Sequence, residues 1–138
     1  MSNLMHTIKQ HDIDLVFAQE PYVIENKVTG VSRNYRTFIN GNHRIRTAIL
    51  VTNEHINAIQ VNQISDEDDV VTKLIHGSLR VYAARMYLDI KRDINIDFTR
   101  VDNISSLASG NGLIIGMDSN TRSKAWHDII KKRARKIS

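Results

Sequence analysis

Hydrophobic and polar positions follow two different periods along this chain. Within residues 2–10 and again within 94–108, apolar side chains recur every three or four positions, which is the spacing of one face of a helix. The second of these segments is followed by Gly110 and Gly112, which suit a helix end. The pattern therefore predicts two amphipathic helices, and Ser123 to Ile130 could begin a third.

Several shorter segments alternate with period two or are almost continuously apolar, and these predict strands. The expected strands are Ile13 to Ala18, Tyr35 to Ile39, Ile45 to Val51, Ile56 to Ile64, Val70 to Ile75, Leu79 to Leu88 and Leu113 to Met117. The first and the last are nearly continuous apolar runs, so we expect the first to be covered on both faces and the last to be buried.

Turns and loops separate these strands. Asn40-Gly41 and His76-Gly77-Ser78 have the composition of tight turns, whereas the polar segment 25–34 predicts a surface loop. The resulting order of elements is neither all-β nor a regular β-α-β alternation. It predicts an α/β fold in which one β-sheet layer, or a pair of layers, is flanked by helices, and the 138 residues form one domain over 1–138.

The composition narrows the class of protein. The 41% of hydrophobic and 25% of charged residues are ordinary for a globular protein, and no stretch reaches the roughly 18 apolar residues of a membrane span. The first ten residues lack the apolar core of a signal peptide. Together with the absence of cysteine, this favours an intracellular protein without disulfides or a thiolate metal site.

The net charge of +4 is compatible with a polyanionic partner, and the distribution of the charge says more than its total. Basic residues cluster at Arg33, Arg36, Arg44 and Arg46, then at Arg122, Lys124 and 131–136. Such clusters suit phosphate contacts with a nucleic acid. For the last eight residues, a solvated basic tail is an equally good interpretation.

Polar side chains follow three of the predicted strands, in the segments 19–22, 86–89 and 117–120. A carboxylate after a strand lies at the edge of a sheet, where ligands usually bind, and Mg²⁺ prefers oxygen ligands. Glu20 and Asp118 are therefore candidate partners for a divalent cation. The competing interpretation is structural, because Asp and Asn also begin turns after strands.

The amino-acid sequences of these segments resemble motifs of a known protein family. Asp14 to Tyr22 is similar to the strand and metal-ligand motif of the endonuclease domains of non-LTR retrotransposons, within the endonuclease/exonuclease/phosphatase superfamily. Ile115 to Ser123, followed by Trp126-His127-Asp128, resembles the Asp-x-Asn motif of the arthropod elements. Arg46 to Ile49 and Ala83 to Asp89 match the strands between them, so the resemblance covers essentially the whole chain.

The resemblance implies a role for each of four residues. Glu20 would hold a Mg²⁺ or Mn²⁺ ion, Asp118 would orient or deprotonate the attacking water, and Asn120 would hold the scissile phosphate. Tyr87 would contact the phosphate and support its developing charge; its alternative is a core aromatic residue. The implied reaction is hydrolysis of a DNA phosphodiester in the nucleus. The parent polyprotein would carry a reverse transcriptase, and the 3′-hydroxyl at the nick would prime DNA synthesis by that enzyme.

The chain also departs from the family pattern. Complete relatives begin with another strand that carries an asparagine and end with a Ser-Asp-His segment. The resemblance therefore implies a partial α/β sandwich of sheet layers flanked by helices, truncated at both ends, and we expect little nicking activity. His127 is no substitute for the terminal histidine, because it lies beside the Asp-x-Asn motif. Two alternatives remain open: another branch of the superfamily, such as an abasic-site nuclease or a phosphatase, and a non-catalytic nucleic-acid-binding module.

Overall fold

A computed structural model describes residues 2–19, 21, 23–24, 27–28, 30–40, 45–62, 69–88 and 93–117. Within these ranges the helices are α1 (Ser2–His11) and α2 (Ile94–Leu107). The strands are β1 (Leu15–Gln19), β2 (Val23–Ile24), β3 (Lys27–Val28), β4 (Arg36–Phe38), β5 (Thr47–Val51), β6 (Asn57–Gln60), β7 (Asp69–His76), β8 (Leu79–Met86) and β9 (Gly112–Met117). Neither described helix is long and apolar enough to cross a membrane.

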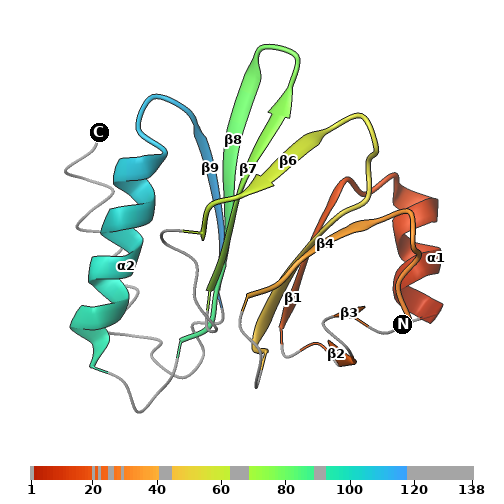
Figure 1. The fold of residues 1–138 in the computed structure, drawn as a ribbon, viewed down its shortest axis with the longest axis horizontal. Coiled ribbons are helices and arrows are strands. Elements are labelled where there is room, and N and C mark those ends of the chain that lie inside the picture. Colours follow the sequence, from red (N-terminus) through yellow and green to blue (C-terminus); the bar gives the residue numbers. More distant parts are fainter. Residues whose placement is uncertain are drawn as a thin grey trace.

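The strands form two larger sheets that pack face to face. One sheet has the order β1-β5-β4 and the other β6-β7-β8-β9, while β2 and β3 form a small separate hairpin. Figure 1 shows four layers: α2, the four-stranded sheet, the three-stranded sheet and α1. The predicted α/β sandwich of sheet layers flanked by helices is confirmed.

The β7–β8 hairpin is the longest strand pairing among the described residues and follows the predicted pattern. Its strands pair antiparallel from Asp69↔Met86 to His76↔Leu79. Gly77 in the turn has φ +61°, a left-handed conformation that glycine adopts without steric cost. The turn predicted at His76-Gly77-Ser78 is therefore confirmed.

Helix α2 connects β8 to β9 and makes them parallel neighbours. The side chain of Asp93 accepts a hydrogen bond from the backbone N–H of Asn95 and so caps the start of the helix. The helix ends at Leu107, and Gly110 follows with φ +82°. This return across one face of the sheet brings the ends of β8 and β9 to the same edge.

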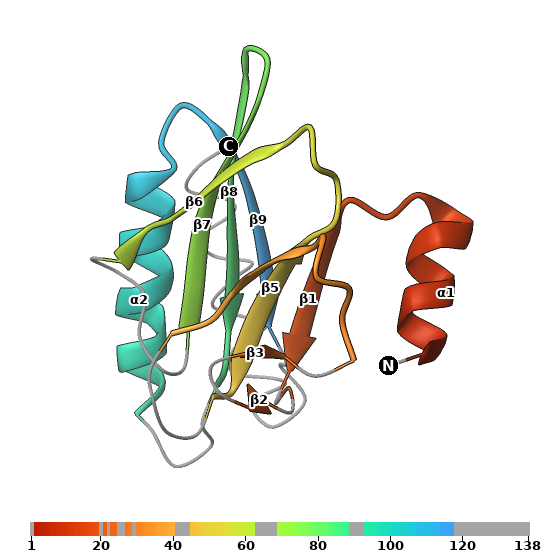
Figure 2. The same ribbon diagram turned by 45° about the vertical axis from the view of Figure 1, so that its right-hand side comes forward.

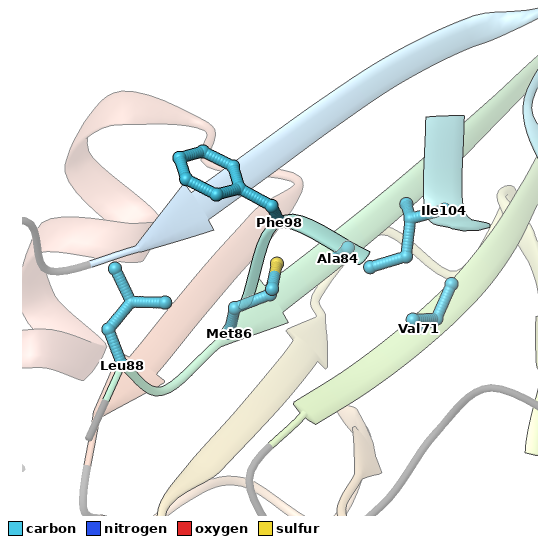
Figure 3. Close-up of a cluster of buried hydrophobic side chains, with 6 residues drawn as sticks. All are labelled: Val71, Ala84, Met86, Leu88, Phe98 and Ile104. Atoms are coloured by element: carbon cyan, nitrogen blue, oxygen red, sulfur yellow. The ribbon is translucent and has the colours of Figure 1, made fainter. Parts of the chain in front are cut away.

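Three hydrophobic clusters make up the core of the described residues. The cluster between α2 and the four-stranded sheet contains six buried residues, which Figure 3 shows in close-up: Val71, Ala84, Met86, Leu88, Phe98 and Ile104. A second cluster lies between the two sheets around Ile49 and Val70, and a third covers the outer face of β5 around Leu50 and Val28. Strand β5 is consequently buried on both faces along its whole length.

Some expectations need correction. Strand β1 is half-buried rather than covered on both faces, because it is an end strand of its sheet. Strand β9 is likewise an end strand, and it is partly exposed rather than buried. The segment expected to be a loop contains part of the β2–β3 hairpin, and Val28 packs into the core.

Other expectations fall partly outside the described residues. Asn40 is described but Gly41 is not, and the connection from Ile39 to Arg46 is longer than a two-residue hairpin turn. Strand β6 ends at Gln60, and Ile64 lies outside the described ranges, as does the predicted helix from Ser123 to Ile130.

Candidate active site

Strands β1, β8 and β9 run in the same direction, although β1 belongs to the other sheet. Leu15, at the start of β1, shares an apolar pocket with Val81 near the start of β8. Further along, the ring of Phe17 lies directly on Gly116 of β9. Figures 1 and 2 show the three strands running toward the same edge of the molecule. The edge at which β1, β8 and β9 end is called the rim below.

At the rim, a hydrogen bond joins the two sheets. Nη2 of Arg85, in β8, donates to Oε1 of Gln19, the last residue of β1, at 3.0 Å. Arg85 is only 8% exposed, so its charge lies in the space between the sheets. Thr47 of β5 is the register partner of Gln19 and is fully buried, and its hydroxyl has no hydrogen-bond partner among the described residues.

A second cation lies at the rim on a tyrosine ring. The guanidinium carbon of Arg46 is 4.4 Å from the centre of the Tyr87 ring, which is the geometry of a cation–π contact. Tyr87 directly follows Met86, the last residue of β8, and Arg46 directly precedes β5. Both side chains are half-buried. Tyr87 therefore lies at the edge of the sheets, and Arg46 restrains its ring.

The structure describes only one of the four residues predicted for the site. Tyr87 lies at the rim, whereas Glu20, Asp118 and Asn120 lie outside the described residues, as does His127. In the sequence, Glu20 directly follows the end of β1 and Asp118 directly follows the end of β9. The structure thus brings together the strand ends that precede the two carboxylates. In the described ranges, no three His, Cys, Asp or Glu side chains form a group that could hold a metal.

Arg85 and Thr47 were not singled out by the sequence analysis. Arg46 was identified as a member of a basic cluster and as the first residue of a segment that resembles the family, but its contact to Tyr87 was not predicted. The sequence could have indicated Arg85 as a functional residue, because it is a charged residue in an otherwise uncharged part of β8. It also shares a face of the strand with Ala83, which is buried. Thr47 also carried a signal, because it is the one polar residue of β5.

Comparison with solved structures identifies the fold. The endonuclease domain of TRAS1, a telomere-specific non-LTR retrotransposon, matches 86% of this chain with a TM-score of 0.73 and 20% sequence identity. A humanized D. rerio TDP2 matches 93% of the chain with a TM-score of 0.67 and 14% identity. ANGEL2, a 2′,3′-cyclic phosphatase, matches 87% with a TM-score of 0.54 and 20% identity.

The chain spans about half the length of these structures, covering 52% of the TRAS1 domain, 57% of the TDP2 chain and 43% of ANGEL2. No family model and no curated protein matches its sequence. At identities this low, the likeness is one of fold.

Proposed function

Because this chain has the fold of the endonuclease/exonuclease/phosphatase superfamily, we propose that its rim is part of a metal-dependent endonuclease site that cleaves DNA phosphodiester bonds. One observation carries the proposal: β1, β8 and β9 end at the same edge. The sequence places Glu20, Tyr87 and Asp118 directly after those three ends. Residues far apart in the chain are thereby available to one phosphate.

The polar groups at the rim suit a hard divalent cation such as Mg²⁺ or Mn²⁺. Such ions prefer oxygen ligands, which the carboxylates of Glu20 and Asp118 would supply. Within the part of the chain that the structure describes, the buried hydroxyl of Thr47 has no hydrogen-bond partner. A buried polar group of this kind is costly unless a ligand or water forms a hydrogen bond with it. A polar, hydrated centre beside Gln19 and Thr47 would satisfy it.

Each residue at the rim has a distinct part in the proposed hydrolysis. Glu20 holds the metal, which when bound supplies a Lewis acid for the phosphoryl oxygens. Asp118 orients and deprotonates the attacking water, and Asn120 holds the scissile phosphate. The hydroxyl of Tyr87 donates to the phosphoryl oxygen as negative charge develops, and the stacked Arg46 holds its ring in place.

DNA is the proposed substrate, and target-site nicking during retrotransposition is the proposed context. The likeness to the TRAS1 endonuclease domain and the basic clusters of the sequence support both. In this context the enzyme acts in the nucleus, and its parent polyprotein carries a reverse transcriptase that extends the nicked strand.

A second candidate function is that of another branch of the same fold. The matches to TDP2 and to ANGEL2 favour it, because the latter is a phosphatase. Three substrates separate these branches: supercoiled plasmid for an endonuclease, a duplex with one abasic site for a repair nuclease, and a phosphate monoester for a phosphatase. A third candidate function is that of a non-catalytic nucleic-acid-binding module, which would cleave none of the three substrates.

The metal site is tested by titrating the protein with Mn²⁺ and measuring the concentration of free Mn²⁺ by electron paramagnetic resonance. Glu20→Ala and Asp118→Ala should each weaken binding by at least tenfold, because each removes a carboxylate ligand. Glu54→Ala is the matched control, since Glu54 is an exposed carboxylate in a turn away from the rim. Equal Mn²⁺ affinity of the unmodified chain and of all three variants would contradict the proposed site. Salt-dependent DNA binding that is the same in Glu20→Ala, in Asp118→Ala and in the unmodified chain would then favour the non-catalytic module.

Nicking activity is expected to be low in this chain. It spans about half the length of the TRAS1 domain, and the family resemblance implies further phosphate contacts in a terminal Ser-Asp-His segment. Incubation of supercoiled plasmid with Mg²⁺ should therefore release little open-circular product. Robust nicking that disappears in Glu20→Ala would contradict the expected low activity, while supporting the site itself.

A further inference from the structure

The β7–β8 hairpin extends beyond the rest of the sandwich at the end opposite the rim, as Figure 1 shows. Two large apolar side chains are exposed at this end of the sheet: Leu79, the first residue of β8, is 60% exposed, and Ile114 of β9 is 47% exposed. Both line the same groove. Exposed apolar side chains that share a groove mark a surface that another molecule can cover.

The groove lies between the projecting hairpin and the start of β1, and its volume is about 180 Å³. Six of its lining side chains are apolar: Leu15, Ile56, Leu74, Leu79, Val81 and Ile114. An apolar cavity of about 150 Å³ holds a benzene molecule. The groove therefore has room for one branched aliphatic side chain from another molecule.

One side of the groove is acidic, and the end of the hairpin is basic. Asp14, which directly precedes β1, lines the groove on one side, and His76 of β7 lines it on the other. His76 is the register partner of Leu79, and the exposed Arg80 follows Leu79 in β8. When Leu79 enters a groove on another molecule, an imidazole and a guanidinium come with it. A carboxylate beside that groove, in the position of Asp14, is complementary to both.

We propose that the occupant of the groove is a second copy of this chain, with Leu79 of each copy in the groove of the other. The projecting side chain and the groove belong to one surface, so a two-fold axis allows both insertions at once and gives a closed dimer. His76 and Arg80 of each copy then lie beside Asp14 of the other, and Ile114 is covered in the same interface. This interface lies at the end of the sandwich away from the rim, so the inference does not depend on the proposed function.

Sedimentation equilibrium of the whole chain measures this association. The mean mass should rise with concentration and level off at twice the mass of one chain, because an isologous contact is used up in the dimer. Leu79→Ser removes the inserted side chain and should raise the dissociation constant of the dimer by at least about tenfold. Since Leu79 is exposed in the single chain, this variant should fold like the unmodified protein, which circular dichroism checks. Ile59→Ser is the matched control and should leave the dissociation constant unchanged, because Ile59 is 58% exposed in β6 but lies outside the groove.

Disulfide cross-linking locates the contact. The chain contains no cysteine, so Leu79→Cys and Ile56→Cys each introduce a single thiol. Mixed under mild oxidation, these two variants should form a disulfide-linked pair, because Leu79 of one copy enters the groove that Ile56 of the other copy lines. A mixture of Ile59→Cys and Ile56→Cys should form far less of such a pair.

Three results of sedimentation would overturn the inference: a chain that stays monomeric at every concentration, a mass that continues to rise beyond that of the dimer, and equal losses of affinity for Leu79→Ser and Ile59→Ser. A dimer that tolerates Leu79→Ser but is lost in Ile114→Lys would mean that the copies pair through the edge of β9 without use of the groove. That result would overturn the inference as well.

Discussion

Arg100 of α2 lies between two buried carboxylates and forms an ion pair with each. It pairs with Asp69 at the start of β7 and, at 3.3 Å, with Asp97 one turn earlier in the same helix. Asp69 and Asp97 are 1% and 0% exposed. Attraction between buried charges is weakly screened by water. The guanidinium group of Arg100, which both carboxylates share, therefore holds α2 against the start of β7.

Removing this cation should be strongly destabilising. Arg100→Met leaves two buried carboxylates without their common partner, and we expect the free energy of unfolding to fall by about 3 kcal/mol. Urea denaturation followed by circular dichroism measures the change. Arg80→Met, at an exposed position of β8, should change the value by less than about 0.5 kcal/mol. A loss below about 1 kcal/mol for Arg100→Met would mean that the ion pairs contribute little.

Gly116 is the residue that lets β1 approach β9. A Cβ added at this position would overlap with Cδ2 of Phe17. Gly116→Ala should therefore destabilise the protein by about 1–3 kcal/mol, because Phe17 must move out of its place between the sheets. Urea denaturation measures this as well. Gly112→Ala is the milder comparison, since its Cβ would meet a methyl group of Val81 at 3.1 Å.

A double-mutant cycle tests whether contact with Phe17 is the cause. Phe17→Leu shortens the side chain, so the pair Phe17→Leu and Gly116→Ala should cost less together than the sum of the single changes. Strict additivity would show that Gly116→Ala acts through the backbone of β9 instead.

Individual residues were predictable from the sequence only where local spacing placed them. The helical spacing of Phe98 and Ile104 marks them as core residues, and both are buried. The hydrogen bond between Arg85 and Gln19 joins positions 66 residues apart, so no local pattern can indicate it. The same holds for the ion pair of Asp69 with Arg100. Polar contacts between distant segments depend on the packing of the sheets, which the periodicity of a single strand does not contain.

At the scale of elements, long segments were predicted better than short ones. The two helices and the β7–β8 hairpin agree with the sequence pattern to within one or two residues, because each contains several repeats of its period. Strands β2 and β3 have two residues each, too few to show alternation, and they were missed. Strand β9 was predicted to be buried because its sequence is apolar, but its position at the end of the sheet leaves Ile114 47% exposed.

The β7–β8 turn depends on the backbone of Gly77. Its φ of +61° is strained for a residue with a Cβ, although the space around it is open. Gly77→Ala should therefore lower the free energy of unfolding by about 1 kcal/mol through backbone conformation alone. Gly77→Asn should cost less, because asparagine tolerates the left-handed region. Equal losses for both variants in urea denaturation would indicate that an unseen contact, rather than φ, determines the cost.

For the molecule as a whole, the sequence predicted that several strands end at one edge better than it predicted the contacts that hold those ends together. Polar residues after three apolar strands indicated a site at a sheet edge, and the ends of β1, β8 and β9 do meet at one edge. That β1 reaches this edge from the opposite sheet follows from the packing of Phe17 on Gly116, which involves segments about a hundred residues apart. The cations that line the rim were recognisable only once that packing was known.

The side of the sandwich formed by β1 and β9 is open to further pairing. In the part of the chain that the structure describes, β1 pairs only with β5 and β9 only with β8, so each presents one edge without a neighbouring strand. Neither strand contains a charged residue or a proline, the usual means of protecting such an edge. The open edges also fit the finding that the chain spans about half of the TRAS1 domain.

This open side should make the protein self-associate. We expect the apparent mass in analytical ultracentrifugation to rise with concentration over the micromolar range, because strand pairing between copies satisfies backbone groups and covers Ile114. Ile114→Lys places a charge on the β9 edge and should hold the chain monomeric. Ile96→Lys is the matched control, since Ile96 is similarly exposed, at 51%, but lies on α2. If both lysine variants reduce association equally, general surface hydrophobicity is the cause; if only Ile114→Lys does, pairing through β9 is.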